Sequence, residues 1–135
     1  MKIRNLVVSA FLLSSLSGAP TVMAADPVVA LMGIVTDMRG ELSLSDEQNA
    51  KLDNWIAEAP AKREALEREA RQLRIELRDN ILLGLSRFER EQLKSRLAEK
   101  EMLLIEMRSI CTNFLRDTLS EDDFKRVVDS YRNRV

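Results

Sequence analysis

Histidine is absent from this sequence of 135 residues, and cysteine occurs once, at Cys111. The lack of histidine removes both the commonest general base and the commonest metal ligand. A solitary thiol cannot form an intramolecular disulfide, so the fold must be held together by packing. With only four glycines, no glycine-rich loop precedes a helix in the manner of phosphate sites. We therefore expect no catalytic residues, no bound metal and no cofactor.

The first 25 residues have the three zones of a secretory signal. Lys2 and Arg4 precede an apolar run over residues 6–16, and Ala24 and Ala25 supply small residues at its end. The run is about half of the roughly 20 residues that a permanent membrane helix requires. We expect a signal peptide over residues 1–24, with cleavage after Ala25 as the alternative. A single periplasmic domain over residues 25–135 would remain, without stable membrane insertion.

Charge gives no sign of a nucleic-acid partner. Removing Lys2 and Arg4 from the 21 basic residues leaves 19, against 22 acidic ones. A chain with this slight negative excess has no general attraction for a phosphate backbone.

Long helices dominate the rest of the chain, because Leu, Glu, Arg, Lys, Gln and Ala are abundant and no strand-like alternation occurs. Three helices are expected to begin after a Leu-Ser pair, whose serine can cap the first turn. The residues that could complete a reciprocal capping box are Gln48, Glu89 and Asp123. Pro60 and Gly84 interrupt the pattern. The expected helices cover 46–58, 60–83, 87–118 and 121–133, with a shorter one over 28–38.

The helical period predicts one core face on each long helix. On the first these residues are Leu66, Ala70, Leu73, Leu77 and Ile81. On the second they are Leu93, Leu97, Leu104, Met107, Cys111, Phe114, Leu115 and Thr118. The short turn near Gly84 should make the two helices neighbours. We expect an all-α fold, built on a long antiparallel helical hairpin with short flanking helices.

A second, outward stripe is the candidate binding surface. It comprises Arg68, Arg71, Ile75, Arg78 and Leu82 on the first long helix and Met102 and Ile105, with Ala98, on the second. Aliphatic groups mixed with arginine stems are typical of protein contact surfaces. Two alternatives remain: a contact with a client or second subunit, or coverage by the chain's own terminal helices. Pairs such as Glu64 with Arg68 and Glu67 with Arg71 suit surface ion pairs.

Cys111 falls within a predicted core face. There a thiol packs as a small hydrophobic group. An intersubunit disulfide is the alternative in an oxidising compartment.

The capped helix starts resemble the LTxxQ motif of the Spy/CpxP family of periplasmic stress proteins. The front copy consists of Leu44, Ser45 and Gln48, with Ser in place of Thr. The rear copy keeps Leu119 and Ser120 but has Asp123 where glutamine is usual. The likeness in order and spacing covers nearly all of residues 25–135.

The resemblance implies a cradle-shaped homodimer that acts as an ATP-independent chaperone for unfolded envelope proteins. The alternative that it implies is a periplasmic regulator that docks on a sensor kinase under envelope stress. A structural helical dimer is a third candidate. The metal-responsive branch of the superfamily uses histidine-rich segments, so their absence argues against that branch here.

Overall fold

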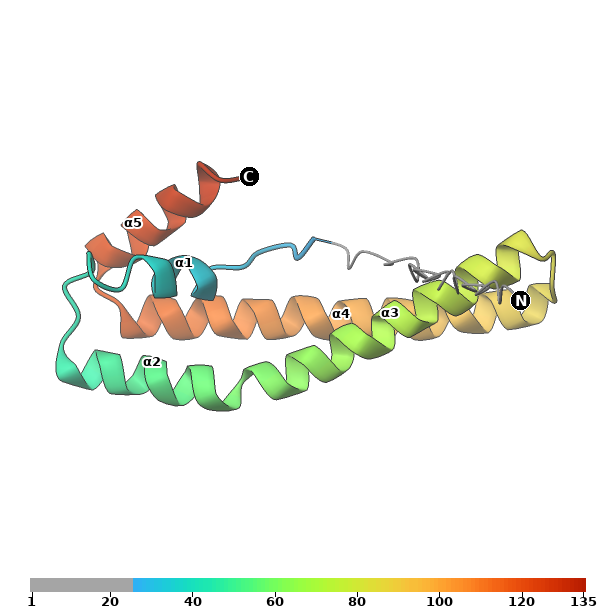
Figure 1. The fold of residues 1–135 in the computed structure, drawn as a ribbon, viewed down its shortest axis with the longest axis horizontal. Coiled ribbons are helices and arrows are strands. Elements are labelled where there is room, and N and C mark those ends of the chain that lie inside the picture. The colour runs from blue at the N-terminus through green and yellow to red at the C-terminus, as the bar shows by residue number, and fades with distance from the viewer. Residues whose placement is uncertain (1–25) are drawn as a thin grey trace, which may run out of the picture.

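The computed structural model describes residues 26–135, and within them it is all-helical, without strands (Figure 1). The expected signal peptide lies outside the described residues. The helices are α1 (Met32–Asp37), α2 (Asp46–Glu58), α3 (Pro60–Leu82), α4 (Arg87–Thr118) and α5 (Glu121–Arg132). The four longer helices match the predicted ranges to within one residue. The first helix is shorter than predicted, since it begins at Met32 and not at residue 28.

The α2 and α3 helices follow each other with a bend, which Figure 1 shows beneath α4. Ala59 both ends α2 and begins α3, and its backbone N–H still donates to the Trp55 carbonyl at 2.9 Å. Pro60 has no N–H to continue the helical ladder, and its ring disfavours a straight helix at this point. The proline therefore separates a short arm, α2, from the long shaft formed by α3 and α4.

The turn between α3 and α4 has the hydrogen bonds of a Schellman motif. Gly84 adopts a φ of 62°, which glycine tolerates because it has no Cβ. The Leu85 N–H donates to the Asn80 carbonyl at 3.1 Å, and the Gly84 N–H donates to the Ile81 carbonyl at 3.3 Å. The chain reverses here, and α3 and α4 lie side by side as an antiparallel pair (Figure 1).

Packing between α3 and α4 is confined to a narrow seam. Ala70 and Leu73 are buried, as the helical period predicted, while Leu66 and Leu77 are half-buried. The assignment of Ile81 to this face is wrong, because the side chain is 55 % exposed. Asn80 takes the inward position at the end of the hairpin and is buried there.

The α4 side of the seam is buried only at its far end. Leu115 and Thr118 are buried. The other predicted core residues of α4 are half-buried: Leu93, Leu97, Leu104, Met107, Cys111 and Phe114. Two helices alone cannot enclose a side chain on every side, so the shaft is thin and keeps much of its apolar surface in contact with water.

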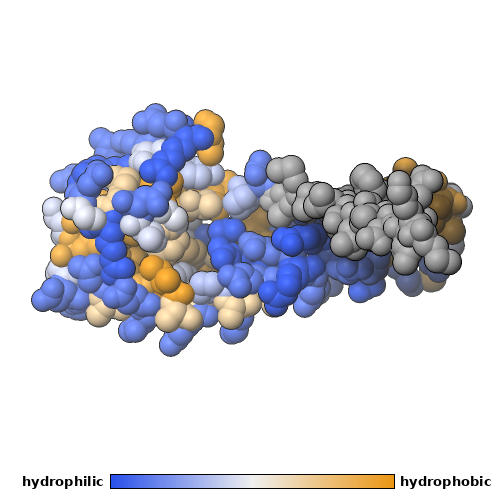
Figure 2. All heavy atoms as spheres, in the orientation of Figure 1, coloured by the Kyte–Doolittle hydropathy of each residue, from blue (hydrophilic) through white to orange (hydrophobic). Residues whose placement is uncertain are grey.

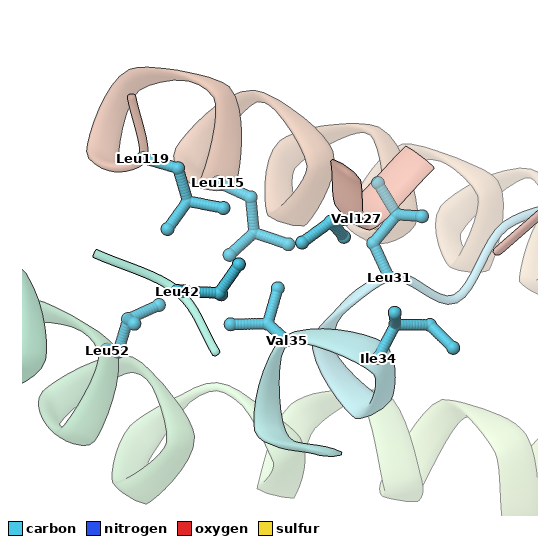
Figure 3. Close-up of a cluster of buried hydrophobic side chains, with 8 residues drawn as sticks. All are labelled: Leu31, Ile34, Val35, Leu42, Leu52, Leu115, Leu119 and Val127. Carbon is cyan, nitrogen blue, oxygen red and sulfur yellow. The ribbon is translucent and has the colours of Figure 1, made fainter. Parts of the chain in front are cut away.

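The main hydrophobic core lies at the opposite end from the hairpin turn. There α1 lies next to α5 beside the end of α4 (Figure 1), and side chains from α1, α2, α4, α5 and the adjoining loops meet in one cluster (Figure 3). Its buried members are Leu31, Ile34, Val35, Leu42, Leu52, Leu115, Leu119 and Val127. This end holds the fold together, and the shaft projects from it.

Candidate binding surfaces

The α3 part of the predicted stripe lies along the outer side of the shaft. Arg68, Arg71 and Arg78 are exposed, as is Leu82, while Ile75 is half-buried. These side chains leave the helix on the side opposite Ala70 and Leu73, which face α4. The five residues therefore form one continuous basic and aliphatic face. The described terminal helices α1 and α5 gather at the core end of the molecule (Figure 1).

The two α4 residues of the stripe are exposed but lie in different places. Met102 is on the side of α4 opposite the seam, so it does not join the outer α3 face. Ile105 lines a small groove of about 170 Å³ together with Ala70 and Arg74 of α3 and with residues 26–28, so it lies at the edge between the two helices.

Ion pairs link α3 to α4 beside the apolar seam. Lys100 lies 2.7 Å from the Glu69 carboxylate, and Arg108 lies 3.1 Å from that of Glu67. Arg74 pairs with Glu101 in the same way. The hydrogen bond between Lys100 and Glu69 raises the pKa of the lysine and lowers the pKa of the glutamate. These contacts fix the register between the two helices.

The ion pairs expected along α3 are not the ones formed. Glu67 interacts with Arg63 at 3.6 Å and with Arg108, and not with Arg71. Glu64 lies 3.7 Å from Arg63 and does not pair with Arg68. Arg108 on α4 competes for Glu67 because it approaches from the neighbouring helix. Within the described residues, Arg68 and Arg71 consequently keep their charges directed toward solvent, which strengthens the basic character of the outer α3 face.

An open groove between α2 and α4 was not anticipated from the sequence. Trp55 and Phe114 stack with their ring centroids 4.1 Å apart and an interplanar angle of 13°. They form the apolar floor of a groove of about 500 Å³, with Lys51 and Lys62 among its polar lining. Phe114 had been assigned to the core face of α4, but its pairing with Trp55 was not predicted.

Cys111 lies on α4, half-buried, and interacts with the Trp55 side chain. Burial raises the pKa of this thiol. A higher pKa leaves less thiolate at neutral pH, and the thiolate is the form that exchanges with other thiols. The half-buried position of Cys111 agrees with the packing role predicted for this thiol.

The two Leu-Ser motifs are connected across the core, and we call this pair of contacts the clasp. The Gln48 amide donates to the Thr118 carbonyl at 2.8 Å, immediately before the second motif. In return, the Ser43 N–H, immediately before the first motif, donates to the Asp123 carboxylate at 3.1 Å. Gln48 and Asp123, each three residues after the serine of its motif, thus each bond to the backbone next to the other motif.

Of the three predicted capping boxes, only the one at Ser45 is complete. Ser45 and Gln48 form the full reciprocal box, with bonds of 3.2 and 2.8 Å. At Ser86 the hydroxyl accepts from the Glu89 N–H at 3.4 Å, and the return bond to the Glu89 side chain is not made.

The clasp explains why the boxes at Ser45 and Ser120 differ. The Ser120 hydroxyl accepts from the Asp123 N–H at 3.2 Å. The other bond of the box, from the Ser120 N–H to the Asp123 carboxylate, is not made. That carboxylate is buried and directed to Ser43. A carboxylate suits this place because its partner is a donor, whereas Gln48 faces a carbonyl acceptor.

Over residues 26–135, no group of three or more His, Cys, Asp and Glu side chains is arranged to hold a metal ion. None of the helices described above combines the length and apolar character that crossing a bilayer requires. No family model matches the chain, and neither a curated protein nor a solved structure matches it.

Proposed function

We propose that this chain is a periplasmic, ATP-independent chaperone-like protein that holds unfolded envelope proteins on its exposed helical faces. The observation that carries the proposal is the outer α3 face, where three exposed arginines alternate with Ile75 and Leu82. Unfolded chains expose apolar side chains and carboxylates together, and this surface offers contacts for both. The Leu-Ser motifs at Ser45 and Ser120 support membership of the Spy/CpxP family as part of the same proposal.

The thin shaft suits weak and adaptable binding. Apolar groups on a two-helix shaft stay accessible, as Met102 and Ile105 do on α4. Such a surface binds many segments without a shaped pocket, and release needs no nucleotide. The aromatic groove at Trp55 and Phe114 gives a second place for a large apolar side chain.

A homodimer is part of the proposal. A second copy that packs against α4 would cover exposed Leu103 and Ile110, leave Met102 accessible and form a cradle. Sedimentation at micromolar protein should give twice the mass of one chain, and Cys111→Ser should leave this mass unchanged because the thiol packs within its own chain. A monomer, or loss of the dimer in the serine variant, would refute this arrangement.

The central test is suppression of aggregation for two unrelated unfolding proteins without nucleotide. The protein should slow aggregation of both. Replacing Arg71 and Arg78 by Glu should weaken protection several-fold at low salt and less at high salt, because salt screens exposed charges. The melting temperature should hardly change, since exposed substitutions shift stability by within about 0.5 kcal/mol.

A matched control reverses the same number of charges elsewhere. Lys125 and Arg132 on α5 are exposed and lie away from the shaft, so changing both to Glu should leave protection intact. Equal loss in both double variants would show that net charge matters and the outer α3 face does not. Unchanged protection in the Arg71 and Arg78 variant would place clients elsewhere.

The alternatives predict different binding. A regulator of a sensor kinase should bind one folded periplasmic domain with saturation and protect neither client. A structural dimer should neither bind the folded sensor domain nor protect the unfolding clients.

A further inference from the structure

The turn between α3 and α4 carries a dense set of exposed apolar side chains. We call residues 80–88 the hairpin tip. Leu82, Leu83 and Phe88 are 74, 70 and 72 % exposed, and Ile81 and Leu85 are also exposed. In Figure 2 this end of the molecule, at the right, shows hydrophobic surface. Single exposed aliphatics are ordinary on proteins, but five within nine residues are not.

The hairpin tip is braced by polar contacts that are partly buried. Arg90 Nε donates to Asn80 Oδ1 at 3.0 Å, and Asn80 Nδ2 donates to the Ser86 carbonyl at 3.4 Å. Gly84 completes the turn with its positive φ. The apolar side chains are therefore presented by a braced turn, which does not have to order itself when it binds.

Charge is distributed in a ring behind the apolar surface. Arg87 is the only charged residue in the tip, and no carboxylate lies within it. The next residues along both helices, Arg78, Asp79, Glu89 and Arg90, are all charged. A lipid surface presents acyl chains, then phosphates, then water. The apolar tip, Arg87 at its edge and the charged residues behind it follow the same order.

The shape of the tip distinguishes a bilayer from a protein partner. The exposed side chains come from the end of α3, the turn and the start of α4, so they surround the end of the shaft and do not line one side of it. A rigid partner surface covers one side of such an end, whereas a fluid lipid layer can cover all of it. With α4 at 32 residues, about 48 Å long, the tip can reach a surface while the core stays well away from it.

We propose that the hairpin tip inserts into the interface of a bilayer that carries anionic headgroups, beyond the proposed chaperone function. Leu82, Leu83, Leu85 and Phe88 enter the acyl boundary, and Arg87 contacts lipid phosphate. The insertion is peripheral, since the apolar segment is far too short to span. Docked in this way, the shaft would stand on the membrane with the part of its outer α3 face from Arg68 to Arg78 available to clients.

The first test follows the tip directly with a fluorescent reporter. Trp55 is the only tryptophan, so Trp55→Phe with Leu83→Trp places a single reporter in the tip. The test uses the protein in the form in which it is isolated from the producing cells. With vesicles of phosphatidylethanolamine and phosphatidylglycerol (3:1), its emission should move to shorter wavelength and be quenched by brominated acyl chains. The matched reporter, Trp55→Phe with Val135→Trp at the exposed C-terminal residue, should show neither effect. Unchanged tip emission, or equal quenching of both reporters, overturns the proposal.

The second test measures binding to the same vesicles by cosedimentation. Leu83→Ser with Phe88→Ser should lower the partition coefficient by about tenfold or more, because two large apolar groups no longer leave water. Ile56→Ser with Val135→Ser, which removes exposed apolar groups from α2 and the C-terminal residue, away from both the tip and the proposed dimer surface, should keep it. Equal losses overturn the proposal. So does a change in the mass of the tip variant without lipid, which would make the tip a self-association surface. The aggregation assay contains no lipid, so its failure would leave this result intact.

Discussion

Leu115→Ala is expected to lower the free energy of unfolding by about 2–5 kcal/mol, the largest effect of any single change considered for this chain. Leu115 is 0 % exposed and lies where α4 meets the core formed with α1, α2 and α5. Truncation removes apolar contacts with all of these elements and leaves a cavity that they cannot fill without moving. Urea unfolding followed by circular dichroism measures the change.

Ile105→Ala is the matched control for that experiment. Ile105 is on the same helix and loses a similar volume, but its side chain is 47 % exposed and lies outside the proposed dimer surface. Its replacement should change the free energy of unfolding by less than about 1 kcal/mol. If the two variants were equally destabilised, the buried cluster at the end of α4 would not be the main core of the protein.

Asp123→Ala should be the second most damaging change, at about 1–3 kcal/mol. The carboxylate is buried, accepts the Ser43 N–H at 3.1 Å and lies 3.4 Å from Arg126. Alanine leaves the Ser43 donor without its partner in a half-buried place, and it removes one side of the clasp. Thermal unfolding should show a clearly lower midpoint.

Asp122→Ala separates the clasp from the helix dipole. Asp122 and Asp123 both lie in the first turn of α5, where a negative charge stabilises the helix, but Asp122 is exposed. Its loss should cost no more than about 1 kcal/mol. Equal destabilisation by the two alanines would attribute the effect to the dipole and remove the clasp as its cause.

Helix boundaries could be predicted from the sequence because their causes are local. Ser45, Ser86 and Ser120 cap helices through bonds that span three residues, and Gly84 ends α3 through its own backbone freedom. Pairing of α3 with α4 followed from the short turn between them. The outward position of Arg71 and Arg78 likewise follows from helical period alone.

Features that depend on contacts distant in the sequence could not be predicted. Helical period placed Ile81 in the seam, but the turn requires an amide there, and Asn80 supplies it by bonding to Arg90. The role of Asp123 appears only when Ser43 is brought beside it. The stack of Trp55 on Phe114 similarly depends on the angle at which α2 leaves Pro60.

The clasp also has a consequence for the order in which the chain folds. Its two hydrogen bonds join residues separated by 70 and 80 positions, whereas the turn at Gly84 joins close neighbours. Closing a flexible loop of that length costs more entropy than closing a tight turn. Once α3 and α4 have paired, most of this loop is already rigid and its two ends are already close. We therefore expect the hairpin to form first and the clasp last, as the step that joins the two ends of the domain.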